Sequence, residues 1–447
     1  MNNASERGHT SRKEQAILGR SPRLKGETAA WVAWAGLAWL AVAGCASPPQ
    51  RPLECLGPWA VGCRRAIAVD PARRDRTLPL AIWYPVEPDQ ATGRRASYTF
   101  YRRWPLTLRL RSDVAVADAP VSRARKWPLI VFSHGAPTLE TQSPNYVETL
   151  ASWGFVVVGV RHVGSSIFDR RTPLQSPAPG VGTVTDGGKS FDAYDVAVAA
   201  KRGERWALDL ASRPENHSLN RPFDVWFTIN WVAEQGEAPS SFLHDAVDAT
   251  RVGVTGHSAG GSTALAAAAS YGDVPPDPRI RAIVAISAAV AGVIPDKVLR
   301  TVAAPTLFVV GDRDERAPWE AETLRAAKLI ASQPAAIVKV RGAGHCQFAD
   351  IEGFAYRLRT LGLYPWTWSW LGGRVLSRAY RECHKEGMLA PCTAQRLLDK
   401  YAVAFFRLHL QGDRTVADTL SPARARRDEP AVELLTPPFP DPARVSK

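Results

Sequence analysis

The stretch Arg251–Ala269 reads RVGVTGHSAGGSTALAAAA and predicts three elements in immediate succession. A short strand-like run, Val252–Thr255, leads into the pentapeptide GHSAG at 256–260, and a run of small helix formers follows at once. Glycines on both sides of Ser258 permit a turn too tight for Cβ atoms. A strand, a sharp turn and a helix in this order lift the central side chain above the end of a sheet. We therefore expect the hydroxyl of Ser258 to be exposed and available as a nucleophile.

A bare G-x-S-x-G also occurs by chance in chains rich in small residues, so its partners decide the interpretation. Downstream, the strand-like run Pro305–Val310 ends before GDRD at 311–314, and Ala336–Val340 ends before RGAGH at 341–345. The carboxyl ends of strands are the edge where open α/β sheets bind their ligands. Ser258, Asp314 and His345 therefore form a candidate nucleophile, orienting acid and base in chain order.

The loop after an earlier strand supplies a candidate for stabilising negative charge. Trp127–Ser133 (WPLIVFS) is a nearly continuous apolar run, as expected of a strand buried on both faces. We expect the backbone N–H groups of Ala136, in the loop that follows, and of Ala259, at the helix start, to point at an oxyanion. We interpret His134 as a loop residue bonded to the backbone, whereas the loop with His162 either lines a pocket or is structural.

Apolar strands that alternate with helical segments predict an α/β fold with a mostly parallel central sheet and helices on both faces. Residues 57–412 are expected to form this domain, with an insertion at about 167–220 as a partial lid and a weakly helical part at Phe191–Leu210. The other expected strands are Ala66–Val69, Leu78–Tyr84, Phe155–Val160 and Ile280–Ser287. The expected helices are Asn145–Trp153, one opening at RPFD 221–224, and a closing helix at Thr393–Leu410.

The chain of 447 residues is basic, with a net charge of +13 and a pI of about 9.7. Its arginines are scattered and no zinc-finger, helix-turn-helix or RNA-binding signature is present, so a solvated basic surface attracted to anionic lipid is favoured over nucleic-acid binding. No Cys or His cluster has metal-ligand spacing. We therefore expect neither a metal nor nucleic acid as a partner.

The N-terminus has the pattern of a secretory signal. Residues 1–28 are polar and basic, Ala29–Ala43 is continuously apolar, and Val42-Ala43-Gly44-Cys45 follows. This ending resembles a bacterial lipobox, which implies removal of residues 1–44 and lipidation of Cys45. Ala46 after it resembles an outer-membrane sorting signal. A plain signal peptide or an uncleaved anchor is the alternative. Residues 45–56 would be a Pro-containing tether.

Five further cysteines fit an exported protein, in which disulfides persist. Close spacing suggests Cys55 with Cys63 and Cys383 with Cys392, with Cys346 free, although the sequence does not fix the connectivity.

Two segments near the C-terminus stand apart from the rest. The Trp-rich segment at 363–371 is expected in the pocket or core, with a membrane-facing surface as the alternative. Residues 413–447 are rich in Pro and Arg, so we expect a disordered tail.

Short motifs along the domain resemble one family. They are GPWAVG at 57–62, DPAR at 70–73, IWYP at 82–85, FSHG at 132–135, RPFD at 221–224 and GHSAG at 256–260. Together they resemble the platelet-activating-factor acetylhydrolase and dienelactone-hydrolase-like group of α/β-hydrolases. The resemblance implies a serine esterase without a cofactor, with the triad Ser258, Asp314 and His345 and the oxyanion donors Ala136 and Ala259. Its acid lies three residues past Gly311, which selects Asp314 over Asp312.

The substrate is less constrained than the chemistry. Dienelactone hydrolases use Cys as nucleophile, so Ser258 favours the acetylhydrolase and polyester-hydrolase side, with short-chain or lipid-type oxygen esters as substrates. A polyester or thioester is the alternative substrate, and a non-catalytic binding protein of the cell envelope is the alternative class. The oligomeric state is not indicated.

Overall fold

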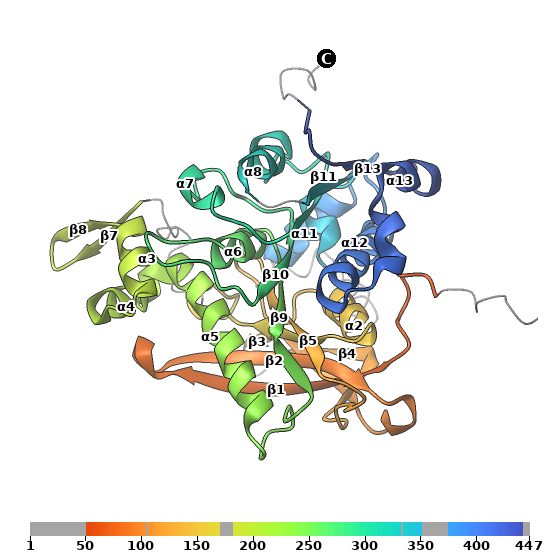
Figure 1. Cartoon of the computed structure of the whole chain (residues 1–447), viewed down its shortest axis with the longest axis horizontal. Coiled ribbons are helices and arrows are strands. Elements are labelled where there is room, and N and C mark those ends of the chain that lie inside the picture. The colour runs from red at the N-terminus through yellow and green to blue at the C-terminus, as the bar shows by residue number, and fades with distance from the viewer. Residues whose placement is uncertain (1–50, 104–105, 170–181, 332–333, 351–373, 441–447) are drawn as a thin grey trace, which may run out of the picture. The chain divides into compact units, whose positions relative to one another are not determined.

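The fold is built on one sheet of eleven strands (Figure 1). Neighbouring strands in this sheet follow the order β13-β12-β11-β10-β9-β5-β6-β2-β1-β4-β3. This computed structural model describes residues 51–440 except 104–105, 170–181, 332–333 and 351–373. Neighbouring strands from β6 through β5, β9, β10 and β11 to β12 are all parallel. The predicted α/β class with a mostly parallel central sheet is therefore confirmed.

The strands are β1 Ala60–Asp70, β2 Arg76–Val86, β3 Arg95–Arg103, β4 Leu106–Ala117, β5 Trp127–Ser133, β6 Val156–Val160, β7 Thr183–Asp186, β8 Lys189–Asp192, β9 Val247–His257, β10 Ile280–Ile286, β11 Thr306–Gly311, β12 Ala335–Val340 and β13 Val432–Leu435. The α-helices are α2 Pro144–Ser152, α3 Ala193–Lys201, α4 Arg205–Ala211, α5 His217–Glu237, α6 Ala259–Ala267, α7 Asp296–Leu299, α8 Arg325–Leu329, α11 Arg374–Cys383, α12 Pro391–Phe406 and α13 Pro422–Asp428.

The sheet is buried on both faces, and β5 shows how. Its side chains alternate between the faces, so Leu129 and Val131 belong to one apolar core while Ile130 and Phe132 belong to the other. Residues of α5 and α6 fill the first core, and residues of α2 and α12 fill the second (Figure 1). Every side chain of β5 and β6 is buried, which explains their uninterrupted apolar runs.

The N-terminal part of the sheet is more extensive than predicted. β1 and β2 form an antiparallel pair of eleven residues each, and the β3–β4 hairpin, which the sequence interpretation did not include, pairs with β1 through β4. Strands at the margin of a sheet keep one face in solvent, so β3 and β4 carry polar and charged residues between the apolar ones. That mixture hid them from a search for apolar runs.

The insertion at 167–220 contains the β7–β8 hairpin and helices α3 and α4, in line with its predicted helical part. Val196 and Ala197 of α3 are buried in the core that α5 and α6 also fill. Helix α5 begins at His217 rather than at Arg221, which corrects the predicted start and places Pro222 inside the helix. The packing of α3 in the domain core does not show whether the insertion covers the site. Its function as a lid therefore stays a prediction.

The predicted disorder of residues 413–447 is wrong for most of the segment. A 3₁₀ helix, α13 and β13 follow Asp413, and β13 pairs antiparallel with β12. Val432 and Leu434 are buried in the second core, and Arg396 and Lys400 of α12 form ion pairs with Glu429. These long-range contacts order a stretch whose composition alone is typical of disorder.

Both predicted disulfides are wrong, because none of the five cysteines in the described part of the chain forms a disulfide. Cys63 lies in β1 facing the core, where burial raises the pKa of its thiol to about 12, while Cys55 is exposed. Cys383 packs with Cys346 and is buried, whereas Cys392 is exposed. Sequence proximity did not bring the side chains together.

Cys45 and the Trp-rich segment at 363–371 lie outside the described residues. Within the described part of the chain, no helix has the length and apolar character needed to span a bilayer.

Candidate active site

Ser258 occupies the turn between β9 and α6 in a backbone conformation rare for a residue with a side chain, with φ 58° and ψ −123°. A Cβ atom at Gly256 or Gly260 would overlap the carbonyl group of Ser133, so the flanking glycines are required by close backbone approach. The N–H of Ser258 donates to the carbonyl of Ile286 at 2.8 Å, which ties the turn to β10. Such backbone strain costs about 1–3 kcal/mol and is typical of functional positions.

Asp314 and His345 meet at the carboxyl ends of β11 and β12. The two carboxylate oxygens of Asp314 lie 3.0 Å and 2.9 Å from His345 Nδ1. Burial raises the pKa of the Asp314 carboxyl, but the hydrogen bond and charge of His345 and the N–H of Ala317 lower it, and the net shift is downward. Asp314 is therefore an anionic acceptor of a hydrogen bond from His345 Nδ1. This bond keeps the proton on Nδ1 and leaves Nε2, on the opposite side of the ring, able to accept a proton.

Asp312 has the other role that its position predicts. Its carboxylate accepts a hydrogen bond from the N–H of Gly342 at 2.7 Å and so caps the neighbouring loop. Of the two carboxylates, Asp314 is the one in contact with His345 Nδ1, and its catalytic role stays a prediction.

His345 lies next to the turn of Ser258. The ring of His257, which precedes Ser258, is 4.8 Å from the ring of His345, and His257 Nε2 lies 2.7 Å from the His345 carbonyl oxygen. Among the hydrogen bonds of the described residues, none joins Ser258 Oγ to His345. Nucleophile and base are often further apart in unliganded sites than in a reacting complex, so this arrangement is compatible with a triad.

The two candidate oxyanion donors belong to different segments, the start of α6 and the loop after β5. Ala259 is the first residue of α6, so its N–H is one of those with no carbonyl partner inside the helix. Ala136 is exposed in the loop after β5. Next to it, His134 is buried, with Nδ1 2.7 Å from the Gly135 carbonyl oxygen and Nε2 accepting from the N–H of His162. The structural interpretation of His134 is confirmed.

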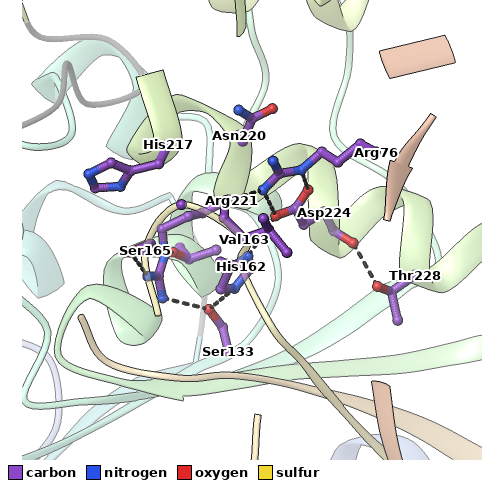
Figure 2. Close-up of polar contacts among 12 residues, drawn as sticks. Arg76, Ser133, His162, Val163, Ser165, His217, Asn220, Arg221, Asp224 and Thr228 are labelled. Atoms are coloured by element: carbon purple, nitrogen blue, oxygen red, sulfur yellow. Dashed lines mark hydrogen bonds and ion pairs between the residues drawn. The ribbon is translucent and has the colours of Figure 1, made fainter. Parts of the chain in front are cut away.

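A second Ser–His–Asp chain lies beneath this loop (Figure 2). Ser133 Oγ is 2.8 Å from His162 Nε2, and His162 Nδ1 is 2.9 Å from Asp224. Burial raises the pKa of the Asp224 carboxyl, but Arg76 and Arg73 hold it well below its usual range. Burial and the nearby Arg221 lower the pKa of His162 to about 3, so its ring is neutral.

Exposure distinguishes the two chains. Ser133, His162 and Asp224 are each 0% exposed, whereas Ser258 is partly exposed. A carbonyl carbon must come within about 3–3.5 Å of the attacking oxygen, which a fully enclosed hydroxyl does not allow. The buried chain is therefore structural, and of the two serines it is Ser258 whose hydroxyl is accessible to a substrate.

Arg221 bonds the loop after β5 through its buried guanidinium, a role that the sequence interpretation did not assign to it. Its guanidinium donates to Ser165 Oγ at 2.9 Å (Figure 2). It also donates to Thr263 Oγ1 at 2.9 Å and to the carbonyl of His134. Burial lowers the pKa of Arg221 to about 9. The signal was present in RPFD at 221–224, where Arg221 and Asp224 each hold one side of the same network.

A polar cavity of about 440 Å³ opens beside His345. Its charged walls combine basic and acidic side chains, namely Arg313, Arg316, Arg378 and Lys385 with Glu315, Glu382 and Glu386. These charged side chains of both signs suit a polar group of a ligand, rather than a purely apolar one, on this side of His345.

Similarity to known proteins covers both parts of this site. A family described as PET hydrolase-like matches residues 216–368, which include Ser258, Asp314 and His345. The family of platelet-activating factor acetylhydrolase, isoform II, matches residues 106–171, which include Ala136.

Curated relatives carry the second name. The platelet-activating factor acetylhydrolase of Gallus gallus is 22% identical over 66% of this chain and 65% of its own, and that of Bos taurus is 26% identical over 53% and 51%. The chain thus spans about half to two thirds of the length of these relatives. A ferulic acid esterase from Streptomyces cinnamoneus shares the fold, with a TM-score of 0.52 and 22% identity over 88% of this chain and 98% of that one.

The mostly parallel sheet and the strained turn at Ser258 define an α/β fold, and parts of the chain are similar to proteins named as ester hydrolases. The family models and the curated relatives make parts of the chain similar to platelet-activating factor acetylhydrolase isoform II and to PET hydrolase-like proteins.

Proposed function

We propose that the protein is a serine hydrolase that cleaves carboxylic esters through Ser258, His345 and Asp314. The observation that carries the proposal is the Asp314–His345 pair, with distances of 2.9 Å and 3.0 Å, beside a strained and partly exposed serine. A buried carboxylate, an oriented imidazole and an accessible hydroxyl are the three groups that acyl transfer requires.

In the proposed reaction, Ser258 Oγ attacks the ester carbonyl while His345 Nε2 takes its proton. Asp314 fixes the ring and stabilises the imidazolium that forms. The N–H groups of Ala136 and Ala259 would hold the tetrahedral oxyanion. His345 then gives its proton to the departing alcohol, which leaves an acyl-enzyme on Ser258. Water, activated by His345, releases the acid and restores the serine.

The nucleophile is tested with Ser258→Ala and a p-nitrophenyl ester. We expect turnover to fall by roughly three orders of magnitude or more while the protein stays folded, because bound water does not replace the nucleophile. A fluorophosphonate probe should label the wild type and not the variant. Ser133→Ala is the matched control, since the buried serine should not be the labelled residue. Near-normal turnover of Ser258→Ala, or labelling lost only in Ser133→Ala, would contradict the assignment.

The substrate class is proposed as short-chain or lipid-type esters, because the acetylhydrolase relatives are named for that chemistry. Polyester hydrolysis is the second candidate, favoured by the PET hydrolase-like match across the whole triad. A chain-length series of p-nitrophenyl esters beside a polyester film separates them. Release of soluble acids from the film at rates near those on the short ester would favour the polyester.

A further inference from the structure

Gln142 joins the loop after β5 to the residue that precedes Ser258. Its Oε1 accepts from the N–H of Gly135 at 2.6 Å, and its Nε2 lies 3.0 Å from His257 Nδ1. His257 continues the chain, because its Nε2 lies 2.7 Å from the His345 carbonyl oxygen. One line of hydrogen bonds therefore connects three loops, which carry the oxyanion donor, the nucleophile and the base.

The direction of every hydrogen bond in this line is fixed. The N–H of Gly135 can only donate and the carbonyl of His345 can only accept. Gln142 must therefore accept through Oε1 and donate through Nε2, and His257 must accept at Nδ1 and donate from Nε2. The line has a single arrangement of protons, with His257 neutral. Burial, together with the nearby His345, lowers the pKa of His257 to about 3.

The line also has little room to move. Gln142 and His257 are 6% and 5% exposed, so water does not replace their bonds. A Cβ atom on Gly135 would lie 3.3 Å from both Gln142 Oε1 and the His257 carbonyl oxygen. Loop, amide and imidazole are in direct contact, so a shift in one is passed to the others.

We propose that Gln142 and His257 are positioning residues that hold the oxyanion loop, Ser258 and His345 in register for the reaction. This inference rests on the proposed function. Neither residue touches the reacting atoms in the mechanism above. Their effect is on the distances between groups that do, and a misplacement of about 1 Å costs on the order of 10²-fold in rate.

The first experiment is a double-mutant cycle with Gln142→Met and His257→Phe, which keep most of the volume and remove the hydrogen bonds. We expect each single variant to lower kcat on p-nitrophenyl butyrate by roughly 10- to 100-fold, with KM changed less than about threefold, because binding is kept while alignment is lost. The double variant should be no slower than the slower single one, because both break the same line.

The second experiment uses Gln142→Glu, which keeps the acceptor for the loop N–H but presents a carboxylate to His257 Nδ1. That bond forms only when the pair holds a proton, either on the imidazole or on the carboxyl group. The other charged or titratable groups that act on His257 are His345, Asp314 and Arg316. We expect the ratio of kcat for this variant to kcat for the wild type to rise at least about fivefold from pH 9 to pH 6, as protonation restores the line. The ratio for Gln142→Met should stay flat.

The control is Gln411→Glu, because Gln411 is another glutamine whose side-chain amide bonds the backbone. Its Nε2 donates to the carbonyls of Trp153 and Gly154, which precede β6 and so lie at the opposite edge of the sheet from the site. It should lower the melting temperature and leave kcat unchanged. If Ser258→Ala abolishes turnover while both Gln142→Met and Gln142→Glu keep kcat within twofold of the wild type at every pH, the positioning role is wrong and the proposed function stands. If Ser258→Ala retains turnover, the proposed function itself fails. A His257→Phe variant that does not fold leaves the decision to the two Gln142 variants.

Discussion

At the scale of single residues, the same side-chain types have opposite roles according to their exposure. Ser133 and Ser258 each lie near a histidine, but one is enclosed at the end of β5 and the other stands partly exposed on a strained turn. The carboxylates divide in the same way. Asp314 faces the imidazole of His345, and Asp312, two residues earlier, faces a backbone N–H.

This division predicts different effects of two conservative changes. Asp314→Asn should lower kcat by roughly 10⁴-fold, because the amide does not stabilise the imidazolium or hold the reactive tautomer. Asp312→Asn should lower the free energy of unfolding by about 1 kcal/mol through its weakened hydrogen bond to Gly342, with kcat nearly unchanged. Kinetics and thermal melts of both variants check this. Loss of turnover in a folded Asp312→Asn variant would reverse the assignment.

The candidate triad could be proposed from sequence because each member follows a recognisable strand. Ser258 comes directly after β9, and Asp314 and His345 lie in the loops that follow β11 and β12, whose apolar runs are local features of the chain. Gln142 and Arg221 were not predicted, because their roles depend on partners up to 115 and 88 positions away. No local spacing marks a side chain that bridges distant loops.

At the scale of elements, the parallel strands bring the site together and the C-terminal segment closes one margin of the sheet. β13 pairs with β12, the strand that leads to His345, and buries Val432 and Leu434. The interior strands were predictable because both of their faces are apolar. The β3–β4 hairpin and β13 were not, because a strand at the margin has a mixed composition and is held by its neighbour.

Truncation after Gly412 is expected to destabilise the protein. It removes two buried large apolar side chains, Val432 and Leu434, each contributing about 1.5–3 kcal/mol. It also leaves Arg396 and Lys400 without Glu429. Thermal melts should show a drop of several degrees. Truncation after Pro440 is the control and should leave the melting temperature unchanged, whereas equal stability of both truncations would show that β13 contributes nothing.

At the scale of the whole molecule, we propose that the chain is attached to the outer membrane through Cys45, as the Val-Ala-Gly-Cys motif implies. Cys45→Ser should move the protein from the membrane to the soluble fraction without loss of turnover on a soluble ester, because stable attachment requires covalent acyl chains. Fractionation with a high-salt wash tests this. A variant that stays with the membrane after the wash would show that lipidation at Cys45 is not the attachment.

The buried histidines and the buried carboxylic acids of the domain have opposite effects on stability as the pH falls. His134, His162 and His257 are buried, and their pKa values are lowered by burial, in the latter two to about 3. The unfolded chain binds these protons below about pH 6.5, so stability falls as the pH falls toward 3. Burial raises the pKa of Glu148 to about 7 and that of Asp399 well above its usual value, so the native state holds these two protons above about pH 4.5.

Between pH 5 and pH 6 these three histidines and His409, whose pKa burial also lowers, make stability rise with pH, while the two acids make it fall. Glu148→Gln tests the balance, because the amide can still accept from Ser112 and Tyr98 but no longer titrates. Its stability should rise more steeply with pH than that of the wild type, by about 1.4 kcal/mol per pH unit, since one opposing proton is gone. Urea unfolding at pH 5.0, 5.5 and 6.0 measures both slopes. An unchanged slope in the variant would mean that Glu148 is ionised in the native state. Only a neutral Glu148 carboxyl gives the native protein one proton more than the unfolded chain.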